Sequence, residues 1–446
     1  MSISVRRRLW PKALAGKAGI VGLGFILILV VTYVAALQFS SKRLADAWKL
    51  SDEFGLPNDL QSILGPEIPP ENNMAVALDE ASAYAKAYLE DVMRQHKIVD
   101  LYDDRNPIID PAYFAAFEGL RNDANYERLL AEAERRTEYR SLLPIRSPCN
   151  IDYSSMQARR SLGDAEAAMA RHLCNTGRHD EAVRRIVRLA GITAKWIDKE
   201  PFLDAMVRGT GIHIAINKEL NRILRSPAKL PSSLHDEIET ELAKADRIID
   251  ALPVMFQTQK IELLSEYAEV SPFSGSWTLK PLENNDRAYL LQLLHARARG
   301  ATKTVREADV LDDVLYGELD RMASDPLDRR LYAGTLALKK KSSITTFPHC
   351  FYNRVAETRC VRVLNAMARR GDFNADVASL NIPGAGSIDP FDGKTLRVKR
   401  TQFGPIIYSV GFDLKDDGGH YQTWLRNGKF DNCLIPTELE QARQKK

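Results

Sequence analysis

The pattern of apolar and polar positions divides the chain into three parts. Residues 18–41, AGIVGLGFILILVVTYVAALQFSS, contain no Asp, Glu, Lys or Arg. From about residue 72 to about residue 370, apolar residues recur every three or four positions, which is typical of helices packed along one face. After Asp372 the apolar spacing changes to two, which is typical of strands. The sequence therefore predicts a membrane-length helix, a long helical region and a small β element.

The first apolar run is long enough to cross a bilayer, because a helix of about 20 apolar residues spans the hydrocarbon layer. Basic residues and no acidic residue precede it, which by the positive-inside rule places the N-terminus in the cytoplasm. The alternative is a cleaved signal peptide, whose apolar core is usually about 7–15 residues and ends in a small-x-small site. We expect a single-pass protein of the bacterial inner membrane with a cytoplasmic tail at 1–17, a transmembrane helix at 18–41 and the bulk of the chain in the periplasm.

The predicted exported helical domain, residues 42–371, divides at turn signals into antiparallel hairpins with solenoid-like packing. Gly177 ends one helix, and Ser233 is a candidate cap for another. A 34-residue repeat of the kind that defines tetratricopeptide arrays is not found. The fold class is therefore mainly α, or α+β overall when the C-terminal part is included. Helices are expected at 75–94, 113–138, 156–175, 179–198, 202–224, 234–249, 254–268, 285–299, 304–322 and 351–370.

The C-terminal module, residues 372–446, is predicted to contain a small β-hairpin. TLRVKR at 395–400 alternates apolar and charged residues, and IIYSV at 406–410 is rich in β-branched and aromatic side chains. Both patterns are typical of strands. A short strand at 433–435 can pair with this hairpin.

The net charge limits the classes of partner that the protein can bind. The chain has a net charge of +3, and five basic residues precede the span, so 3 − 5 = −2 remains for the rest. A nucleic-acid-binding protein needs a concentrated basic face, so nucleic acid is not expected as a partner.

The five cysteines show no C-x-x-C spacing. Cys350 and Cys360 on one helix would lie about 15 Å apart, so a bridge there needs a bend, and free half-buried thiols are the alternative.

Short catalytic motifs are absent from the sequence, including G-x-S-x-G, the P-loop and H-E-x-x-H. The best candidate for chemistry is the Asp/Gly loop that follows the hairpin. Its carboxylates, and glycines that let the backbone curl, suit a calcium ion with six to eight oxygen ligands, although Asp and Gly also favour an ordinary turn. The candidate metal-binding residues are Ser409, Asp413, Asp416 and Asp417.

Four stretches recur in this order elsewhere: IPPENNMAVALDEA (68–81), SPCNIDYSSM (147–156), the run from GRHDEAV to GIHIA (177–215), and DPFDGKTLRV through DNCLIP (389–436). On them the chain resembles a broad group of uncharacterised bacterial single-span membrane-anchored helical proteins. The resemblance implies one N-terminal span, an exported helical region and a small C-terminal β element.

The C-terminal segment also resembles the tail of the major pseudopilins of type II secretion, where a Y-S-x-G-x-D loop holds calcium. Tyr408, Ser409, Gly411 and Asp413 match that motif, so this second resemblance implies calcium binding. At the N-terminus the pattern departs from a pilin-type signal, because Leu29 stands where that signal has a glutamate.

We therefore expect a non-catalytic periplasmic helical scaffold or interaction protein, anchored in the lipid bilayer through residues 18–41. It would bind an unidentified envelope protein and hold a structural calcium ion in the C-terminal loop. One alternative is an accessory component of a secretion or pseudopilus-like envelope machine. Another is a hydrolase whose site is assembled from dispersed Asp, Glu and His residues between helices. A scaffold should show an exposed groove or helix face, and a hydrolase a deep pocket with inward-pointing carboxylates or histidines.

Overall fold

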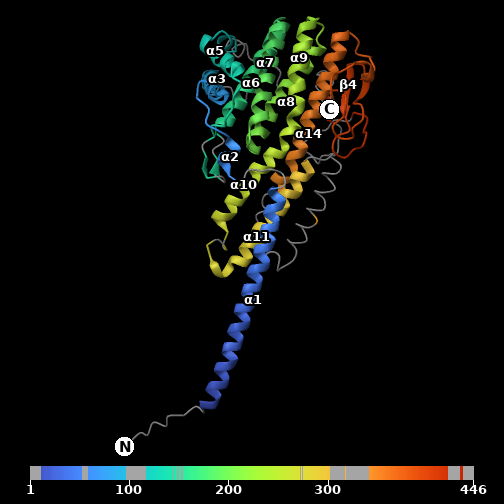
Figure 1. Cartoon of the computed structure of the whole chain (residues 1–446). Coiled ribbons are helices and arrows are strands. Elements are labelled where there is room, and N and C mark those ends of the chain that lie inside the picture. The colour runs from blue at the N-terminus through green and yellow to red at the C-terminus, as the bar shows by residue number, and fades with distance from the viewer. Residues whose placement is uncertain are drawn as a thin grey trace, which may run out of the picture.

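The protein is mainly α-helical with small antiparallel sheets, which confirms the predicted α+β class dominated by helices (Figure 1). A tall group of helices stands above one long helix, which projects downward as a stalk. The computed structural model describes residues 12–52, 59–96, 117–143, 145–147, 150–151, 154–271, 273, 275–301, 317, 341–419 and 432–434.

The stalk is α1 (Lys12–Asp52), a single unbroken helix. Every residue from Gly22 to Thr32 is exposed. In the described part of the chain, this is the one helix long and apolar enough to cross a membrane. Instead of ending with the apolar run at Ser41, α1 continues for three more turns of polar and apolar residues into the body of the protein.

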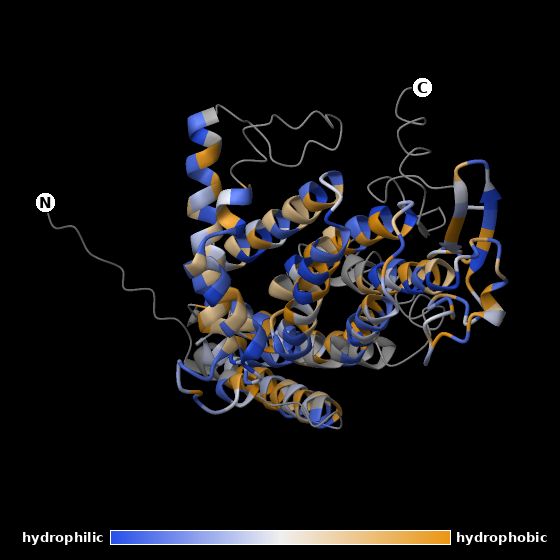
Figure 2. Cartoon of the chain, turned by 90° about the horizontal axis from the view of Figure 1, so that it is seen from above, coloured by the Kyte–Doolittle hydropathy of each residue, from blue (hydrophilic) through white to orange (hydrophobic). Residues whose placement is uncertain are grey.

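Among the described residues, seven helices form the upper bundle (Figures 1 and 2). The successive helices between Ser154 and Ala245 run antiparallel because short turns join them. The helix α3 packs on α5 and α6, α6 packs on α7 and α8, and α9 lies between α7 and α14. The bounds are α3 (Met74–His96), α5 (Ala124–Arg135), α6 (Ser154–Asn175), α7 (His179–Lys199), α8 (Leu203–Arg225), α9 (Ser232–Ala245) and α14 (Lys341–Arg370).

Below the bundle, a helical hairpin descends beside α1 (Figure 1). It is made of α10 (Leu252–Val270) and α11 (Lys280–Ala301), and the 3₁₀ turn η2 (Trp277–Leu279) lies at its tip. The 3₁₀ turn η1 (Asp246–Ala251) links α9 to α10. Pro253 falls in the first turn of α10, where its missing N–H breaks no helical hydrogen bond. A short helix, α2 (Leu60–Leu64), is capped by the Asp59 side chain.

The C-terminal module is a three-stranded antiparallel sheet that packs on α14. Its strands are β3 (Arg397–Thr401), β4 (Gly404–Ser409) and β5 (Asn432–Leu434), with β4 in the middle. Ile407 faces Val398 on one side and Leu434 on the other. The predicted hairpin and its third strand are therefore confirmed. The 3₁₀ turn η4 (Val377–Ser379) precedes the sheet, and a separate pair, β1 (Ile145–Ser147) and β2 (Asn150–Ile151), was not predicted.

Several predicted helix ends are wrong. Ser233 does not cap α9, because Pro231 precedes its first residue, Ser232, and no side chain caps the helix. The helix expected to reach Glu138 ends at Arg135, and Glu138 instead forms an isolated β-bridge with Asn73. The helix expected from residue 351 begins ten residues earlier, at Lys341. The helix predicted at 304–322 lies outside the described residues, apart from position 317.

Two of the five cysteines have described side chains. Cys174 is a free thiol, as one of the two alternatives predicted, and Cys360 is buried. Burial first, and the nearby Glu219 carboxylate second, raise the pKa of Cys174 to about 12. The thiol is therefore protonated and unreactive at neutral pH. The side chains of Cys149, Cys350 and Cys433 lie outside the described part.

Candidate functional site

The most distinctive feature of the structure is a seam between the helices α1 and α11. One face of α1 turns toward α11 over its second half, and the contact positions alternate by four and three residues, which is the spacing of a packed helical face. Ser40 and Ala47 are fully buried there. Their small side chains let the two helix backbones approach closely. The positions on this face are Tyr33, Leu37, Ser40, Leu44 and Ala47.

Polar contacts stabilise the seam at three positions along α1. Near its lower end, the Tyr33 hydroxyl donates to the backbone carbonyl of Trp277. In the middle, the amide of Asn284 donates to the Ser41 hydroxyl at 3.1 Å. Toward the upper end, the Lys260 ammonium lies 5.5 Å from the centre of the Trp48 ring, and burial lowers the pKa of this lysine.

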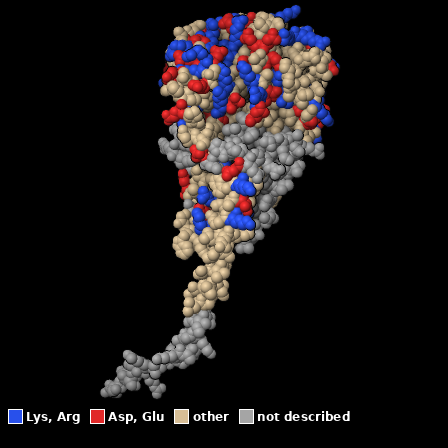
Figure 3. Space-filling model, viewed as in Figure 1, with Lys and Arg blue, Asp and Glu red and all other residues tan. Residues whose placement is uncertain are grey.

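Because of this seam, α1 is a structural part of the body of the protein. Leu44, Ala47 and Trp48 pack with a cluster of buried residues from α10 and α11, among them Leu263 and Leu291. Below the seam, Gly22–Thr32 of α1 presents a surface without charged side chains, whereas Lys, Arg, Asp and Glu cover the upper bundle (Figure 3). The orientation of the apolar segment is therefore fixed relative to the bundle.

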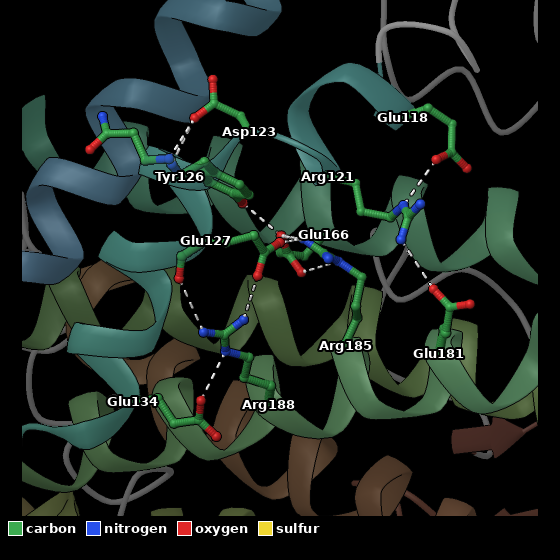
Figure 4. Close-up of polar contacts among 11 residues, drawn as sticks. Glu118, Arg121, Asp123, Tyr126, Glu127, Glu134, Glu166, Glu181, Arg185 and Arg188 are labelled. Carbon is green, nitrogen blue, oxygen red and sulfur yellow. Dashed lines mark hydrogen bonds and ion pairs between the residues drawn. The ribbon is translucent and has the colours of Figure 1, made fainter.

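Interlocked ion pairs hold the outer helices of the bundle together (Figure 4). The Arg185 guanidinium binds both oxygens of Glu166, at 3.0 and 2.9 Å, and also reaches Glu127 at 2.7 Å. Arg188 binds the other oxygen of Glu127 at 2.9 Å. The Tyr126 hydroxyl donates to Glu166 at 2.6 Å. These contacts join α5, α6 and α7 in one network.

The geometry of this network indicates a structural role. The pKa of Tyr126 lies well above its ordinary value, mainly because the side chain is buried and also because the Glu166 carboxylate is close. The tyrosine therefore stays a hydrogen-bond donor at any physiological pH. Each of the two central carboxylates is bound to an arginine, so their charges are compensated where they are buried.

A second buried network lies at the base of α6 and α7. Arg159 is fully buried and binds Asp79 at 2.6 Å and the Tyr139 hydroxyl at 2.9 Å. Its guanidinium lies 4.9 Å from the Trp196 ring centre. The fully buried Glu200 carboxylate accepts hydrogen bonds from Tyr139 and from Trp196 Nε1. Burial is the main cause of the raised pKa of Glu200, and the nearby Arg159 opposes that rise.

A third network ties α14 to α9 and to the loop before the sheet. Arg362 binds Glu239 at 2.6 Å and Asp246 at 2.7 Å, and it donates to the Pro383 carbonyl at 2.8 Å. Arg359 binds the other oxygen of Asp246 at 2.7 Å and the Ile388 carbonyl at 2.8 Å. This network fixes the loop that leads to the β module against the helical bundle.

Two grooves meet at the end of α14, at the opposite end of the molecule from the apolar segment of α1 (Figure 1). The larger, about 500 Å³, lies between α9, α14 and the loop around Asn381. The smaller, about 430 Å³, lies between α14 and the turn after α8. Both are lined by Arg369 and Arg370, which we call the distal arginines. The backbone of Asn381 has a positive φ of 52°, which is uncommon for a residue with a side chain.

The walls of the larger groove combine apolar and charged side chains. Ala366, Leu380 and Ile382 supply apolar surface. The distal arginines are exposed and interact with groups at the rim, Arg369 with Asp236 at 2.5 Å and Arg370 with the Ser379 hydroxyl at 3.1 Å. Such rim pairs are weak in water, so they can be exchanged for a partner's carboxylate.

The predicted metal residues lie at the start of the acidic loop, but the structure does not bring them together as a common set of ligands. Ser409 is fully buried in β4, where its hydroxyl donates to Asp389 at 2.8 Å. Asp413 accepts from the backbone of Lys415, and Asp416 accepts from the Tyr408 hydroxyl at 3.0 Å. Asp417 follows in the same turn and is half-buried.

Among the described residues, no group of three or more His, Cys, Asp or Glu side chains is placed to hold a metal ion. Calcium binding therefore stays a prediction from the sequence. The residue that organises this region is Asp389, which the sequence indicated only as part of DPFDG. It is fully buried and accepts from Ser409, from the backbone of Phe391 and Val410, and from Arg397 at 2.6 Å.

Comparison with known proteins found no match: no protein-family model, no curated protein and no solved structure is similar to this chain. The two resemblances drawn from the sequence therefore remain predictions.

Proposed function

We propose that the protein is a membrane-anchored periplasmic scaffold that presents a protein-binding groove at a fixed height above the inner membrane. The observation that carries this proposal is the continuity of α1, which passes unbroken from an exposed apolar segment into the seam with α11. Simple retention at a membrane needs only a flexible linker. A helix packed along one face also fixes the height and orientation of what it carries.

The location in the inner membrane rests on the sequence. Basic residues precede the apolar run and acidic residues do not, which favours a cytoplasmic N-terminus. The bundle then stands in the periplasm, with the distal grooves turned away from the lipid. An envelope protein is the partner that such a position favours.

The larger groove supports a peptide segment with an acidic side chain as the ligand. Its volume of about 500 Å³ is in the usual range of binding pockets, about 300–1,000 Å³. The apolar wall suits a hydrophobic side chain, and the distal arginines suit a carboxylate, because a guanidinium can bind both carboxylate oxygens.

The proposal is tested by photo-crosslinking in intact cells with the full-length chain. A photoreactive residue replaces Asn381 at the groove, and a control replaces Ala87, which is exposed on α3. We expect a discrete protein adduct from position 381 and none from position 87. Equal adducts at both positions would show nonspecific contact and refute the groove as the binding site.

The seam is tested in the same assay by a matched pair of substitutions on α1. Ala47→Leu places a larger side chain at a fully buried position, whereas Ala45→Leu places the same side chain on the exposed face. Overpacking costs about 1–3 kcal/mol, so Ala47→Leu should loosen α1 from α11. We expect Ala47→Leu to weaken the adduct at position 381 and Ala45→Leu to preserve it. If both preserve it, the rigid seam is not needed for presentation.

The anchor itself has a separate test. Carbonate washing of membranes should leave the full-length chain in the pellet, and mass spectrometry should find an intact N-terminus. A mature chain beginning near Gln38 would mean that the apolar run is a cleaved signal, and the scaffold would then not be fixed to the membrane.

A further inference from the structure

The tip of the α10–α11 hairpin, residues Gly275–Leu282, lies beside the apolar segment of α1. In Figure 1 this hairpin descends along α1 toward the N-terminus of the chain. The Trp277 ring meets the Tyr33 ring edge to face, with centroids 5.9 Å apart and planes at 83°. Tyr33 lies inside the predicted span of 18–41. The tip is therefore level with a part of α1 that the sequence assigns to the bilayer.

The tip exposes large apolar side chains at that height. Trp277 is 75% exposed and Leu282 is 40% exposed, although both belong to an otherwise well-packed hairpin. On the neighbouring helix, Val34 and Phe39 are also exposed, Phe39 by 69%. Tryptophan is enriched where a protein crosses the boundary between lipid and water, because its ring is apolar and its N–H is polar. The exposed surfaces of the tip and of α1 are thus both apolar, and they lie next to each other.

The length of the free part of α1 sets the height of the bilayer. Below Tyr33, the run without charged residues begins at Ala18, directly after Lys17. The hydrocarbon layer is about 30 Å thick, which corresponds to about 20 residues of helix at about 1.5 Å per residue. A layer that begins at Ala18 therefore ends near residue 38, above the level of Tyr33 and Trp277. This placement brings Trp277 into contact with lipid.

Charges at the end of the tip and directly after it, on Lys280, Glu283 and Arg287, limit how deeply the tip enters the membrane. The Lys280 ammonium pairs with Glu283 at 3.0 Å, and Arg287 approaches the same carboxylate at 3.5 Å. Ionised groups are costly within the hydrocarbon, so this cluster belongs among the headgroups. Lys280 can extend its long aliphatic stem and keep its ammonium at that level. Trp277 lies nearer to the hydrocarbon than this cluster because it comes before α11 at the lowest part of the hairpin.

We propose that Gly275–Leu282 is a second membrane contact, which inserts Trp277 and Leu282 into the boundary between headgroups and acyl chains of the periplasmic leaflet. This inference rests on the proposed function in one respect, because it requires α1 to span the bilayer. A single helix is free to tilt and rotate in a membrane, whereas packing and interfacial anchors restrict both motions. With two contacts, the bundle stands at a defined angle as well as at a defined height.

The test uses the full-length chain in lipid nanodiscs and the quenching of tryptophan fluorescence by lipids brominated near the top of the acyl chains. The contribution of Trp277 is the difference between the wild type and Trp277→Phe, which keeps an aromatic ring against Tyr33. Trp48→Phe gives the matched control, because Trp48 lies 15 residues beyond Tyr33 on α1, about 22 Å higher. We expect the Trp277 contribution to lose most of its intensity in brominated lipid and the Trp48 contribution to keep it.

A gain-of-signal variant provides a second measurement if Trp277→Phe does not fold. Leu282→Trp adds an indole at the tip of the otherwise unchanged chain, and its added emission should also be quenched. Retention of the tip emission in brominated lipid, for a chain that resists carbonate extraction, overturns the second contact and leaves the anchor intact. A chain that is extracted by carbonate and not incorporated into nanodiscs overturns both the contact and the proposed function.

Discussion

Removing the buried arginine of the α6–α7 network is expected to destabilise the protein severely. Arg159 and Glu200 are both fully buried, with side-chain charges 4.0 Å apart. Arg159→Met preserves the volume and the apolar stem of the side chain. It removes the pair with Asp79, the hydrogen bond to Tyr139 and the contact with the Trp196 ring. The Glu200 carboxylate then keeps its hydrogen bonds from Tyr139 and Trp196 but is buried without a compensating charge.

The expected loss is about 3–5 kcal/mol of unfolding free energy at pH 7, which is the usual cost of breaking a buried ion pair on one side. Domains are stable by about 5–15 kcal/mol, so this is a large fraction. Glu200→Gln in the same chain removes the uncompensated charge. The double variant Arg159→Met, Glu200→Gln should therefore recover part of the loss, whereas two independent sites would add their losses.

The pH dependence follows from the raised pKa of Glu200. Loss of Arg159 removes the charge that opposes this rise, so the folded variant binds a proton more readily than the unfolded chain. Its stability is then highest below the unfolded value for a glutamate, about 4.3, and falls as pH rises through the folded value. The difference between the single variant and wild type should shrink as pH falls toward that value. The double variant should not show this trend.

The assay is urea unfolding of the full-length chain in nanodiscs, followed by circular dichroism of the helices. The matched control is Arg128→Met, because Arg128 is largely exposed in its pair with Glu132 and such helix pairs contribute about 0.3–0.5 kcal/mol. Our account of this network is refuted if Arg159→Met costs no more than this control. It is also refuted if Glu200→Gln makes the single variant still less stable.

Two further predictions concern the C-terminal loop and a buried histidine. If the loop holds calcium, the unfolding temperature of the protein rises with calcium and falls with a chelator, and Asp413→Ala and Asp417→Ala abolish the rise. A wild-type unfolding temperature that calcium leaves unchanged would refute the calcium site. Burial first, and Arg354 second, lower the pKa of His213 to about 4, and neither ring nitrogen has a hydrogen-bond partner in the described structure. Because the unfolded chain binds a proton on this histidine more readily than the folded chain, stability should fall as pH drops from about 6.5 toward 4. His213→Leu should remove this pH-dependent loss and add about 1 kcal/mol of stability at pH 7. An unchanged pH profile in the variant would contradict this assignment.

The helices could be predicted because their signals are local. Val183, Ile186 and Val187 lie three or four positions apart, and all are buried in α7. Gly177 marks the turn before this helix, and its φ of 80° belongs to the left-handed region that favours glycine. The end of α1 was missed although a signal was present. Leu44, Ala47 and Trp48 continue the helical spacing beyond the apolar run, which indicates a packed helix and not the start of a linker.

The buried ion pairs could not be predicted in the same way. Arg159 and Asp79 are 80 positions apart, and Arg362 and Glu239 are 123 apart. In the sequence these residues resemble the many charged residues on exposed helix faces. Only the packing of α6 on α3, and of α14 on α9, places them opposite each other and away from water. Their energetic importance therefore depends on the tertiary fold.

The acidic loop shows how a correct local pattern can leave the chemistry open. Asp and Gly predicted a turn after the hairpin, and the chain turns there through Gly411, which has a φ of 67°. The hydroxyl of Ser409, however, already donates to Asp389 and accepts from the backbone N–H of Gly411. A calcium ion in this loop would therefore have to draw on Asp413, Asp416 or Asp417 together with backbone carbonyls. Because Ser409 is engaged in holding β4 to the DPFDG turn, its substitution should loosen the whole β module whether or not calcium is present.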